Sequence, residues 1–306
     1  MGDSAMFRKL ICAAAVILAA LSCSKDDGEL DIFASNEVCQ AVKHDFYRRY
    51  SQDVEITSAA RYAEGDMTQI EFVDTDGLKC TAIYKEHTWM MTQKEYCKDG
   101  LAFLGQLPAN IARAYIRAGI DDEDYDNDNS YVIEVSRNGA DRKVYEFEFY
   151  APYSEGDLEF ENYDCHVLVG EDGELIDVLH SGINRSIWWY DMSDAISSVR
   201  NKYPDALILA AINDSGTNTL YIKDRGILKT VKTDHDDKWK ETSYRLADNF
   251  ELPENVRAEY LAYKSENPTF EYSEIYSIER KDGLYYGLTM LVFKNDVVSR
   301  TIYIKA

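Results

Sequence analysis

The sequence predicts an α+β protein built from tandem repeats, each with one helix packed on a three- to four-stranded antiparallel sheet. An internal repeat of helix-starting motifs is the first observation behind this prediction. The second is that short strand-like segments, separated by Asp, Asn and Gly turns, follow the predicted helices, as is typical of antiparallel hairpins. With 306 residues, the chain suits two such domains better than one.

Two predicted helices begin with the same pattern. Leu107-Pro108-Ala109-Asn110-Ile111 matches Leu252-Pro253-Glu254-Asn255-Val256. Proline suits the first helical position because its missing N–H would have no helical partner there. Apolar residues then recur at helical spacing in both copies. They are Ile111, Tyr115 and Ala118 in the first copy and Val256, Tyr260 and Tyr263 in the second.

Two other predicted helices share a different pattern, an apolar stripe that follows a serine able to cap the helix. The stripe residues are Val38, Val42, Phe46 and Tyr50 in the first copy and Ile196, Val199 and Tyr203 in the second. Strand-like segments follow each helix and lead to a tryptophan, so that Trp89-Met90-Met91-Thr92 corresponds to Trp239-Lys240-Glu241-Thr242. The equivalent positions of the two tryptophans predict a shared packing role.

These repeats predict the following organisation. Residues 1–22 form a signal peptide and residues 23–34 a lipidated tether. Residues 35–182 form a first pair with units at 35–98 and 104–182, residues 183–191 an aromatic linker, and residues 192–306 a second pair with units at 192–247 and 250–306. In each unit the helix covers one face of the sheet, and the other face is left open or packs on the partner unit.

Several motifs together carry a family resemblance. They are the Tyr203-Pro204 helix end, the Trp-x-x-Thr strand, the Leu-Pro helix start and the hairpins at Asp76-Gly77, Asp172-Gly173 and Asp282-Gly283. Over nearly the whole mature chain this pattern resembles the beta-lactamase-inhibitor-like, PepSY-like family of bacterial envelope lipoproteins. The resemblance implies a secreted binding or inhibitory module, although not inhibition of a beta-lactamase, because function lies in sites carried by a fold. Asp237-Lys238 departs from the pattern, which has Asp-Gly before the tryptophan.

The N-terminal residues predict export. Arg8 and Lys9 precede an apolar run of 12 residues, Leu10 to Leu21, which is too short for a permanent membrane span. The sequence Ala20-Leu21-Ser22-Cys23 resembles the lipobox of bacterial lipoproteins, so Cys23 is the predicted lipidation site. Lysine and acidic residues follow at 24–29, and they favour the outer face of the outer membrane, with the periplasmic face as the alternative.

Charge excludes one class of partner. Cleavage after Ser22 removes Asp3, Arg8 and Lys9, which leaves 31 basic and 54 acidic residues and a net charge of −23. Nucleic acid binding needs clustered Lys and Arg for the phosphates, so nucleic acid is not an expected partner. The membrane is instead expected to be reached through the lipid on Cys23.

Patterns for metal binding or catalysis are weak throughout. The mature chain's other cysteines, Cys39, Cys80, Cys97 and Cys165, lack zinc-ligand spacing, and they can form three alternative pairings or remain free thiols. Asp214-Ser215-Gly216 resembles an aspartic-protease turn without its necessary second copy. The acidic run at 121–129 lacks the glycine and glutamate of a calcium loop. The sequence therefore predicts no enzyme activity, no metal and no cofactor.

Aromatic residues give the candidate contact surface. The chain has 23 tyrosines, and Trp188, Trp189 and Tyr190 lie between the two pairs, where a plain linker would be polar. Rigid aromatic side chains are preferred contact residues, so these three are candidate binding residues, although packing between the two pairs is the favoured interpretation of the cluster. The sequence thus predicts an outer-membrane-anchored, non-enzymatic lipoprotein whose Tyr-rich open sheet faces bind a protein or peptide. The alternative is a glycan-binding accessory lipoprotein.

Overall fold

The computed structural model describes residue 33 and residues 38–62, 66–96, 104–117, 126–155, 158–180, 192–214, 217–294 and 296–306. The first half contains α3 (Gln40–Tyr50), β1 (Glu55–Tyr62), β2 (Met67–Val73), β3 (Lys79–Lys85), β4 (Thr88–Tyr96), α4 (Ala109–Arg117), β5 (Asp126–Arg137), β6 (Val144–Glu155), β7 (Leu158–Gly170) and β8 (Leu175–His180). The second half contains α5 (Ser193–Lys202), β9 (Leu207–Asp214), β10 (Thr217–Asp224), β11 (Ile227–Thr233), β12 (Trp239–Arg245), α6 (Glu254–Glu266), β13 (Glu274–Arg280), β14 (Gly283–Lys294) and β15 (Asp296–Lys305).

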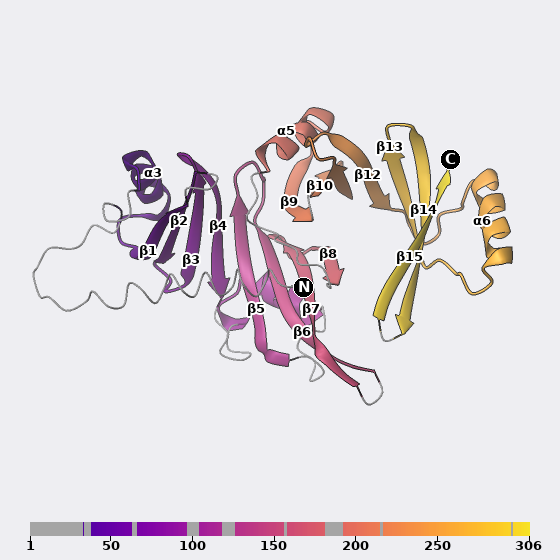
Figure 1. The fold of residues 1–306 in the computed structure, drawn as a ribbon, viewed down its shortest axis with the longest axis horizontal. Coiled ribbons are helices and arrows are strands. Elements are labelled where there is room, and N and C mark those ends of the chain that lie inside the picture. Colours follow the sequence, from indigo (N-terminus) through magenta and orange to yellow (C-terminus); the bar gives the residue numbers. More distant parts are fainter. Residues whose placement is uncertain are drawn as a thin grey trace, which may run out of the picture.

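The strands form two antiparallel sheets in which every strand pairs with its neighbours in the sequence. One sheet has eight strands, β1 to β8, and the other has seven, β9 to β15. The predicted α+β class with antiparallel sheets is confirmed. Separate sheets of three or four strands are not formed, because β4 pairs with β5 and β12 pairs with β13 across the intervening helix. Figure 1 shows the two halves side by side along the long axis, with α3 near one end and α6 at the other.

The first helix of each half is attached to its sheet by the same two contacts. In the second half, Tyr203 Oη and Trp239 Nε1 each donate to Thr242 Oγ1 at 2.8 Å. The equivalent residues of the first half, Tyr50, Trp89 and Thr92, make the same pair of contacts. In each half the tyrosine therefore fixes the helix end to the strand, and the tryptophan bonds the same threonine from within that strand. Both tryptophans also pack against the core cluster under their helix, which confirms the predicted packing role.

The second helix of each half begins where the Leu-Pro motif predicts. Helix α4 starts at Ala109 and α6 at Glu254, each directly after the proline. The leucine before the proline is buried in both copies. Ile111 and Val256, the first stripe positions, are fully buried against the sheets. The repeated motif therefore anchors both helices in the same way.

The structure places Asp236-Asp237, and not Asp237-Lys238 as predicted, at the Asp-Gly position, because Asp237 N donates to Asp234 O as Gly77 N donates to Asp74 O. Asp237 accordingly adopts the left-handed backbone that glycine has at the other Asp-Gly turns. Its φ is 57°, compared with 80° at Gly77 and 83° at Gly173. Left-handed backbone costs an ordinary L-residue roughly 1–2 kcal/mol, and aspartate tolerates it because its side chain can hydrogen-bond locally. Here Asn218 Nδ2 donates to Asp237 Oδ1. The departure from the sequence pattern therefore preserves the turn.

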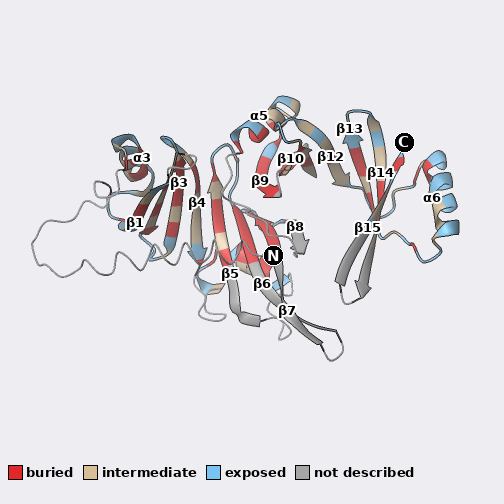
Figure 2. Ribbon diagram, viewed as in Figure 1, coloured by how far each residue is buried: buried red, intermediate tan, exposed pale blue. Residues whose placement is uncertain are grey.

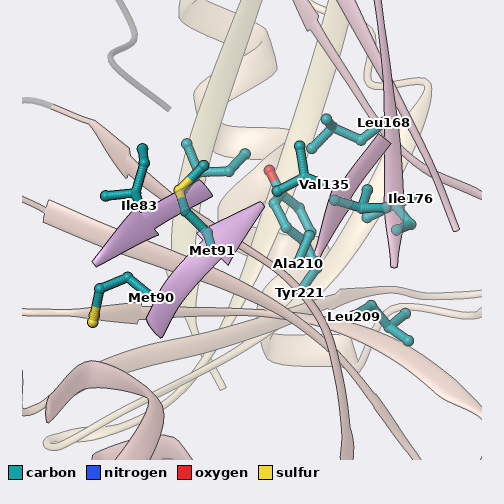
Figure 3. Close-up of a cluster of buried hydrophobic side chains, with 11 residues drawn as sticks. Ile83, Met90, Met91, Val135, Leu168, Ile176, Leu209, Ala210 and Tyr221 are labelled. Atoms are coloured by element: carbon teal, nitrogen blue, oxygen red, sulfur yellow. The ribbon is translucent and has the colours of Figure 1, made fainter. Parts of the chain in front are cut away.

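The two halves meet through a contact between sheets (Figure 3). The first sheet contributes residues from the face turned away from α3 and α4, and β9 and β10 contribute the opposing ones. The cluster consists of Ile83, Met90, Met91, Val135, Val144, Leu168 and Ile176 on one side and Leu209, Ala210, Ile212 and Tyr221 on the other. Figure 2 accordingly shows buried residues concentrated in the central strands, whereas α6 is mostly exposed.

Polar contacts reinforce this junction. In the turn between β5 and β6, Asp141 N donates to Ile208 O at 2.9 Å, and Ile208 N donates to Asp141 Oδ2 at 2.8 Å. Arg200 Nη2 donates to Gly139 O at 2.7 Å and to Asp141. On the other side of the cluster, Tyr221 hydrogen-bonds the Asp177 carboxylate. For the first sheet, the face turned away from the helices was predicted to be either open or packed on the partner unit. It is not open, and it packs on β9 and β10 of the second half of the chain.

Several sequence predictions fall outside the described residues. They are the signal peptide, Cys23, most of the tether and the linker residues Trp188, Trp189 and Tyr190. Across the described ranges, no helix combines the length and the apolar character needed to cross a bilayer. Cys39 and Cys80 are free thiols. Since each of the three pairings uses both of these cysteines, none of the pairings is formed in full.

Candidate functional site

The candidate site is the face of the second sheet turned away from α5 and α6. We call it the Arg280 face. It consists of Lys232, Glu241, Ser243, Arg245, Glu274, Tyr276, Ile278, Arg280, Tyr285, Gly287, Tyr303 and Lys305, from strands β11 to β15. Cross-strand partners share a face of a sheet. One row of partners runs Glu241–Arg280, the next Ser243–Ile278–Tyr285–Lys305, and the third Arg245–Tyr276–Gly287–Tyr303.

Arg280 is the centre of this face. Its Nε donates to Glu241 Oε2 at 3.0 Å, and its Cζ lies 5.0 Å from the Tyr285 ring centroid and 4.8 Å from that of Tyr303. The guanidinium therefore lies over the sheet between a carboxylate and two aromatic rings. Cation–π contacts of this kind contribute about 0.5–1 kcal/mol each at exposed sites. They keep a long, charged side chain in a defined position at the surface.

A small residue makes room beneath the arginine. A Cβ atom placed on Gly287 would lie 2.8 Å from Ile278 Cδ1 and 3.5 Å from Thr301 Cγ2. The absent side chain thus leaves the space that Ile278 fills. Although Ile278 lies on the open face, only 4% of it is exposed. The face therefore has an apolar floor with Tyr and Arg side chains around it.

Ionic contacts surround this centre. Arg245 Nη1 lies 3.4 Å from Glu274 Oε1, Lys232 Nζ lies 3.3 Å from Glu241 Oε1, and Lys305 Nζ lies 3.8 Å from Asp282 Oδ2. The cations of these pairs are largely exposed, although Glu274 and Glu241 are mostly buried, so each pair contributes only modestly to folding stability. Arg245 Nη2 also lies 2.9 Å from Asp248 Oδ1. Each cation of the face, Lys232, Arg245, Arg280 and Lys305, is thus paired with a carboxylate, so the charges of the face are balanced.

The hydroxyls of Tyr276 and Tyr285 stay protonated at neutral pH. Burial, followed by the hydrogen bond to Glu274, raises the pKa of Tyr276 above its ordinary value. Its hydrogen bond to Asp282 raises the pKa of Tyr285. Tyr303, on the edge strand, is 53% exposed. The face therefore offers neutral phenols and fixed cations, which suits contacts and not acid–base chemistry.

Two other places bring together side chains that could form a site. The Cys39 thiol lies 3.3 Å from His87 Nδ1, a proximity that sequence spacing does not reveal because 48 residues separate them. A nucleophilic cysteine also needs a group that orients the imidazole, and within the described part of the chain His87 makes no second hydrogen bond. In the same ranges, no group of three or more His, Cys, Asp and Glu side chains could hold a metal ion.

The second place is a cleft of about 420 Å³ beside Trp89 and the turn between β5 and β6. Two of its charged residues bind other parts of the molecule, and one of these contacts crosses to the second half of the chain. Lys143 Nζ donates to Glu134 Oε1 at 2.6 Å, and Asp141 is bound by Arg200 at 3.0 Å. This cleft therefore belongs to the junction of the two halves, and the Arg280 face remains the candidate site.

Comparison with known proteins gives matches among solved structures. No family model and no curated protein matches the chain. A BLIP-like protein from Bacteroides fragilis matches with a TM-score of 0.34 and 15% identity, covering 49% of this chain and 92% of that one. A DUF2874 family protein from Bacteroides ovatus matches with a TM-score of 0.33 and 13% identity, covering 46% and 86%. Another from Bacteroides uniformis has a TM-score of 0.30 and 14% identity, covering 46% and 88%.

The chain is thus similar in structure to BLIP-like and DUF2874 proteins of Bacteroides at low sequence identity. These are proteins of the kind that the sequence motifs resemble.

Proposed function

We propose that this chain is a non-enzymatic envelope lipoprotein that binds a protein or peptide partner through the Arg280 face. The observation that carries the proposal is the grouping of the half-buried Arg280 and Tyr285 with the exposed Tyr303 around the buried Ile278. Tyrosine and arginine are enriched among residues that dominate binding energy at protein interfaces. A preordered arginine also loses less side-chain freedom when a partner binds.

The lipobox-like sequence supports the location. Lipidation of Cys23 would anchor the chain in the outer membrane, on the cell surface or on the periplasmic face, and leave both sheets free of the bilayer. Trp188, Trp189 and Tyr190 remain candidate contact residues in addition to those of the Arg280 face.

The contacts that the Tyr285 and Tyr303 rings already make favour a protein partner over the glycan alternative. Sugar binding by tyrosine requires a free ring face for stacking. At this site the Arg280 guanidinium already lies over both the Tyr285 and the Tyr303 ring. The remaining groups are hydroxyls, cations and an apolar floor, which match the mixed surface of a protein or peptide.

The test is affinity capture with residues 24–306 from the envelope and culture fluid of the native host. Proteins retained by the unchanged chain are compared with those retained by Tyr303→Ala and Arg280→Ala. Substitution of a central interface residue typically costs about 2 kcal/mol or more of binding energy. One dominant protein is therefore expected to be retained by the unchanged chain and lost with both variants.

Tyr62→Ala is the matched control, because Tyr62 is similarly exposed, at 47%, but lies on β1 in the other sheet. It is expected to retain the same protein as the unchanged chain. Retention that survives Tyr303→Ala and Arg280→Ala would move the binding surface elsewhere. A parallel variant, Trp188→Ala with Trp189→Ala, measures the contribution of the linker aromatics.

A further inference from the structure

The Trp-x-x-Thr motif aligns the strands of the two halves. Met91 and Glu241 are each the second residue after the motif tryptophan. Met91 pairs with Arg137, and Glu241 pairs with Arg280. Each of these arginines is the last residue of its strand, β5 or β13. Strand β5 therefore corresponds to β13, and the strands that follow correspond in order.

Strand β7 of the first sheet thus corresponds to β15 of the second. The aligned cross-strand pairs are Val135–Val144 with Ile278–Tyr285, and Phe147–Val167 with Leu288–Ile302. On its other side β7 pairs with β8, whereas β15 pairs with β14 alone among the described strands and forms the edge of its sheet. The position that β8 occupies beside β7 is therefore open beside β15.

Apolar side chains that are covered in the first half are open at this edge. Val167 lies opposite Val178 of β8 and is 3% exposed. Its equivalent, Ile302, packs under α6 but remains partly exposed, and the neighbouring Tyr303 is 53% exposed. A strand added beside β15 would cover Ile302 as β8 covers Val167.

The edge of β15 is also more regular than the other sheet edges. The other edge strands, β1, β8 and β9, each carry one extra residue that interrupts pairing with the neighbouring strand: Thr57, Ile176 and Leu209 respectively. Bulges of this kind hinder the addition of a further strand. Strand β15 pairs with β14 over its 10 residues without a register shift, and it contains no proline. Its outer backbone groups are thus arranged to accept another strand.

Arg300 gives this edge a preference for charge. It lies two residues before Ile302 and therefore on the same side of the sheet. Its Cζ lies 5.6 Å from the Tyr263 ring centroid and 5.9 Å from that of Phe270. Arg300 is exposed, and within the described ranges it makes no ion pair. An acidic residue placed opposite it on an added strand would complement this charge.

We propose that the edge of β15 binds an extended strand of a separate protein, with a β-branched apolar residue opposite Ile302 and an acidic residue opposite Arg300. The pairing is antiparallel, as between β7 and β8. In strand addition, main-chain hydrogen bonds supply affinity and alternate side chains supply specificity. The inference rests on the proposed function and specifies how the partner is held, since the added strand lies next to Tyr303 of the Arg280 face.

The probe is a peptide with the sequence of residues 174–181 and the substitution His180→Asp. In the register of β8, its Val178 lies opposite Ile302 and its new aspartate opposite Arg300. It is titrated into isotope-labelled residues 24–306, and amide hydrogen exchange is followed by NMR. Alternate amides of β15 are expected to exchange more slowly, because every second N–H of an antiparallel strand points to the same neighbour.

Two protein variants test the predicted charge preference. Arg300→Ala is expected to raise the dissociation constant of the peptide about two- to fivefold, the effect of an exposed ion pair. Arg61→Ala is the matched control, because Arg61 is an exposed arginine on the edge strand β1. It is expected to leave the dissociation constant unchanged. An equal effect of the two variants would contradict the acidic position.

Two N-methylated peptides test main-chain pairing. One carries N-methyl groups at Asp177 and Leu179, and the other carries them at Ile176 and Val178. One form is expected to lose binding and the other to keep it, because only one set of amides faces β15. Equal binding of the two forms, or an absence of slowed exchange in β15, overturns the inference. Capture that depends on Tyr303 while β15 gains no protection would remove only the added strand and leave the proposed function standing.

Discussion

At the scale of single residues, Glu134 is a charged group held in the core of the first half. Only 7% of it is exposed. Tyr96 Oη and Tyr145 Oη donate to its Oε2 at 3.0 Å and 2.9 Å, and Lys143 Nζ lies 2.6 Å from Oε1. Burial acts to raise the pKa of Glu134, but these donors outweigh it and hold the pKa below its ordinary value. The carboxylate is thus ionised at neutral pH.

This network predicts a pH-dependent contribution to stability. Because the pKa is lower in the folded chain, the stabilisation is complete above the ordinary carboxyl pKa of about 4.3 and is lost as the pH falls through the folded value. Glu134→Gln is expected to cost about 1–3 kcal/mol at pH 7 and less at pH 3. Urea unfolding at both pH values measures this. The exposed Glu259→Gln is the control, and a Glu134→Gln cost that does not change with pH would contradict the argument.

Two turn glycines separate backbone strain from steric contact. Gly77 and Gly173 have φ of 80° and 83°. A Cβ on Gly77 would meet nothing within 4 Å, whereas one on Gly173 would lie 3.1 Å from Asn110 O. Gly77→Ala is therefore expected to cost about 1 kcal/mol from the left-handed backbone alone. Gly173→Ala is expected to cost clearly more, and thermal unfolding of the two variants compares them. Equal costs would show that α4 shifts to make room for the methyl group without a further loss of stability.

At the scale of helices and strands, repeated local signals were sufficient for prediction. The Leu-Pro motif placed the starts of α4 and α6, since its proline sets the first turn and its leucine is buried. The Trp-x-x-Thr motif marked β4 and β12 because the tryptophan and threonine bond each other three residues apart. The pairing of β4 with β5 was not predicted, because a helix lies between those strands in the sequence.

The Arg280 face was also missed from the sequence. Glu241, Arg280, Tyr285 and Tyr303 come from four strands, and only the strand register brings them together. The available signal was the spacing Tyr285, Gly287 and Thr289 on one strand face, where a glycine interrupts larger residues. Local patterns identify strands and their turns, whereas a site assembled across strands depends on pairing that they do not encode.

Packing between Gly287 and Ile278 gives a test at this scale. Gly287→Ala places a methyl group 2.8 Å from Ile278 Cδ1, so it is expected to cost about 1–3 kcal/mol. Ile278→Val removes that Cδ1 and is expected to cost about 0.5–1.5 kcal/mol alone. In the double variant the combined cost should be smaller than the sum of the single costs. Denaturant unfolding measures all three, and strict additivity would mean that the two residues do not share this space.

At the scale of the whole molecule, the halves are joined by the contact between β9–β10 and the first sheet. Leu209 lies in this contact and is 9% exposed, whereas Leu207, two residues earlier on the same strand, is 39% exposed. Leu209→Asp buries an unpaired carboxylate between the halves, which typically costs several kcal/mol. Calorimetry is expected to show a single transition for the unchanged chain and two for Leu209→Asp. Leu207→Asp is the control and should keep one transition.

The sequence did not predict that contact, because it left two alternatives for the sheet face turned away from the helices, either open or packed. Both halves share the order helix, four strands, helix and three strands, to which the first half adds β8, and the main difference lies in side chains at equivalent positions. Val144 and Leu168 favour burial, whereas Tyr285 and Tyr303 suit either environment. Choosing between these outcomes required knowing which β-hairpin lies within reach, and that depends on the whole fold.

The sequential order of the strands also determines how such a chain folds as it leaves a ribosome or a translocation channel. Within each sheet every strand pairs with its neighbours in the sequence, and only the pairings β4–β5 and β12–β13 span a helix, so most pairings close a short loop and the sheets can grow in the direction of synthesis. The face formed by Met91, Val135 and Leu168 is complete before β9 and β10 emerge. Until then it is exposed apolar surface that favours aggregation, and the second half of the chain protects it once β9 and β10 pack on it.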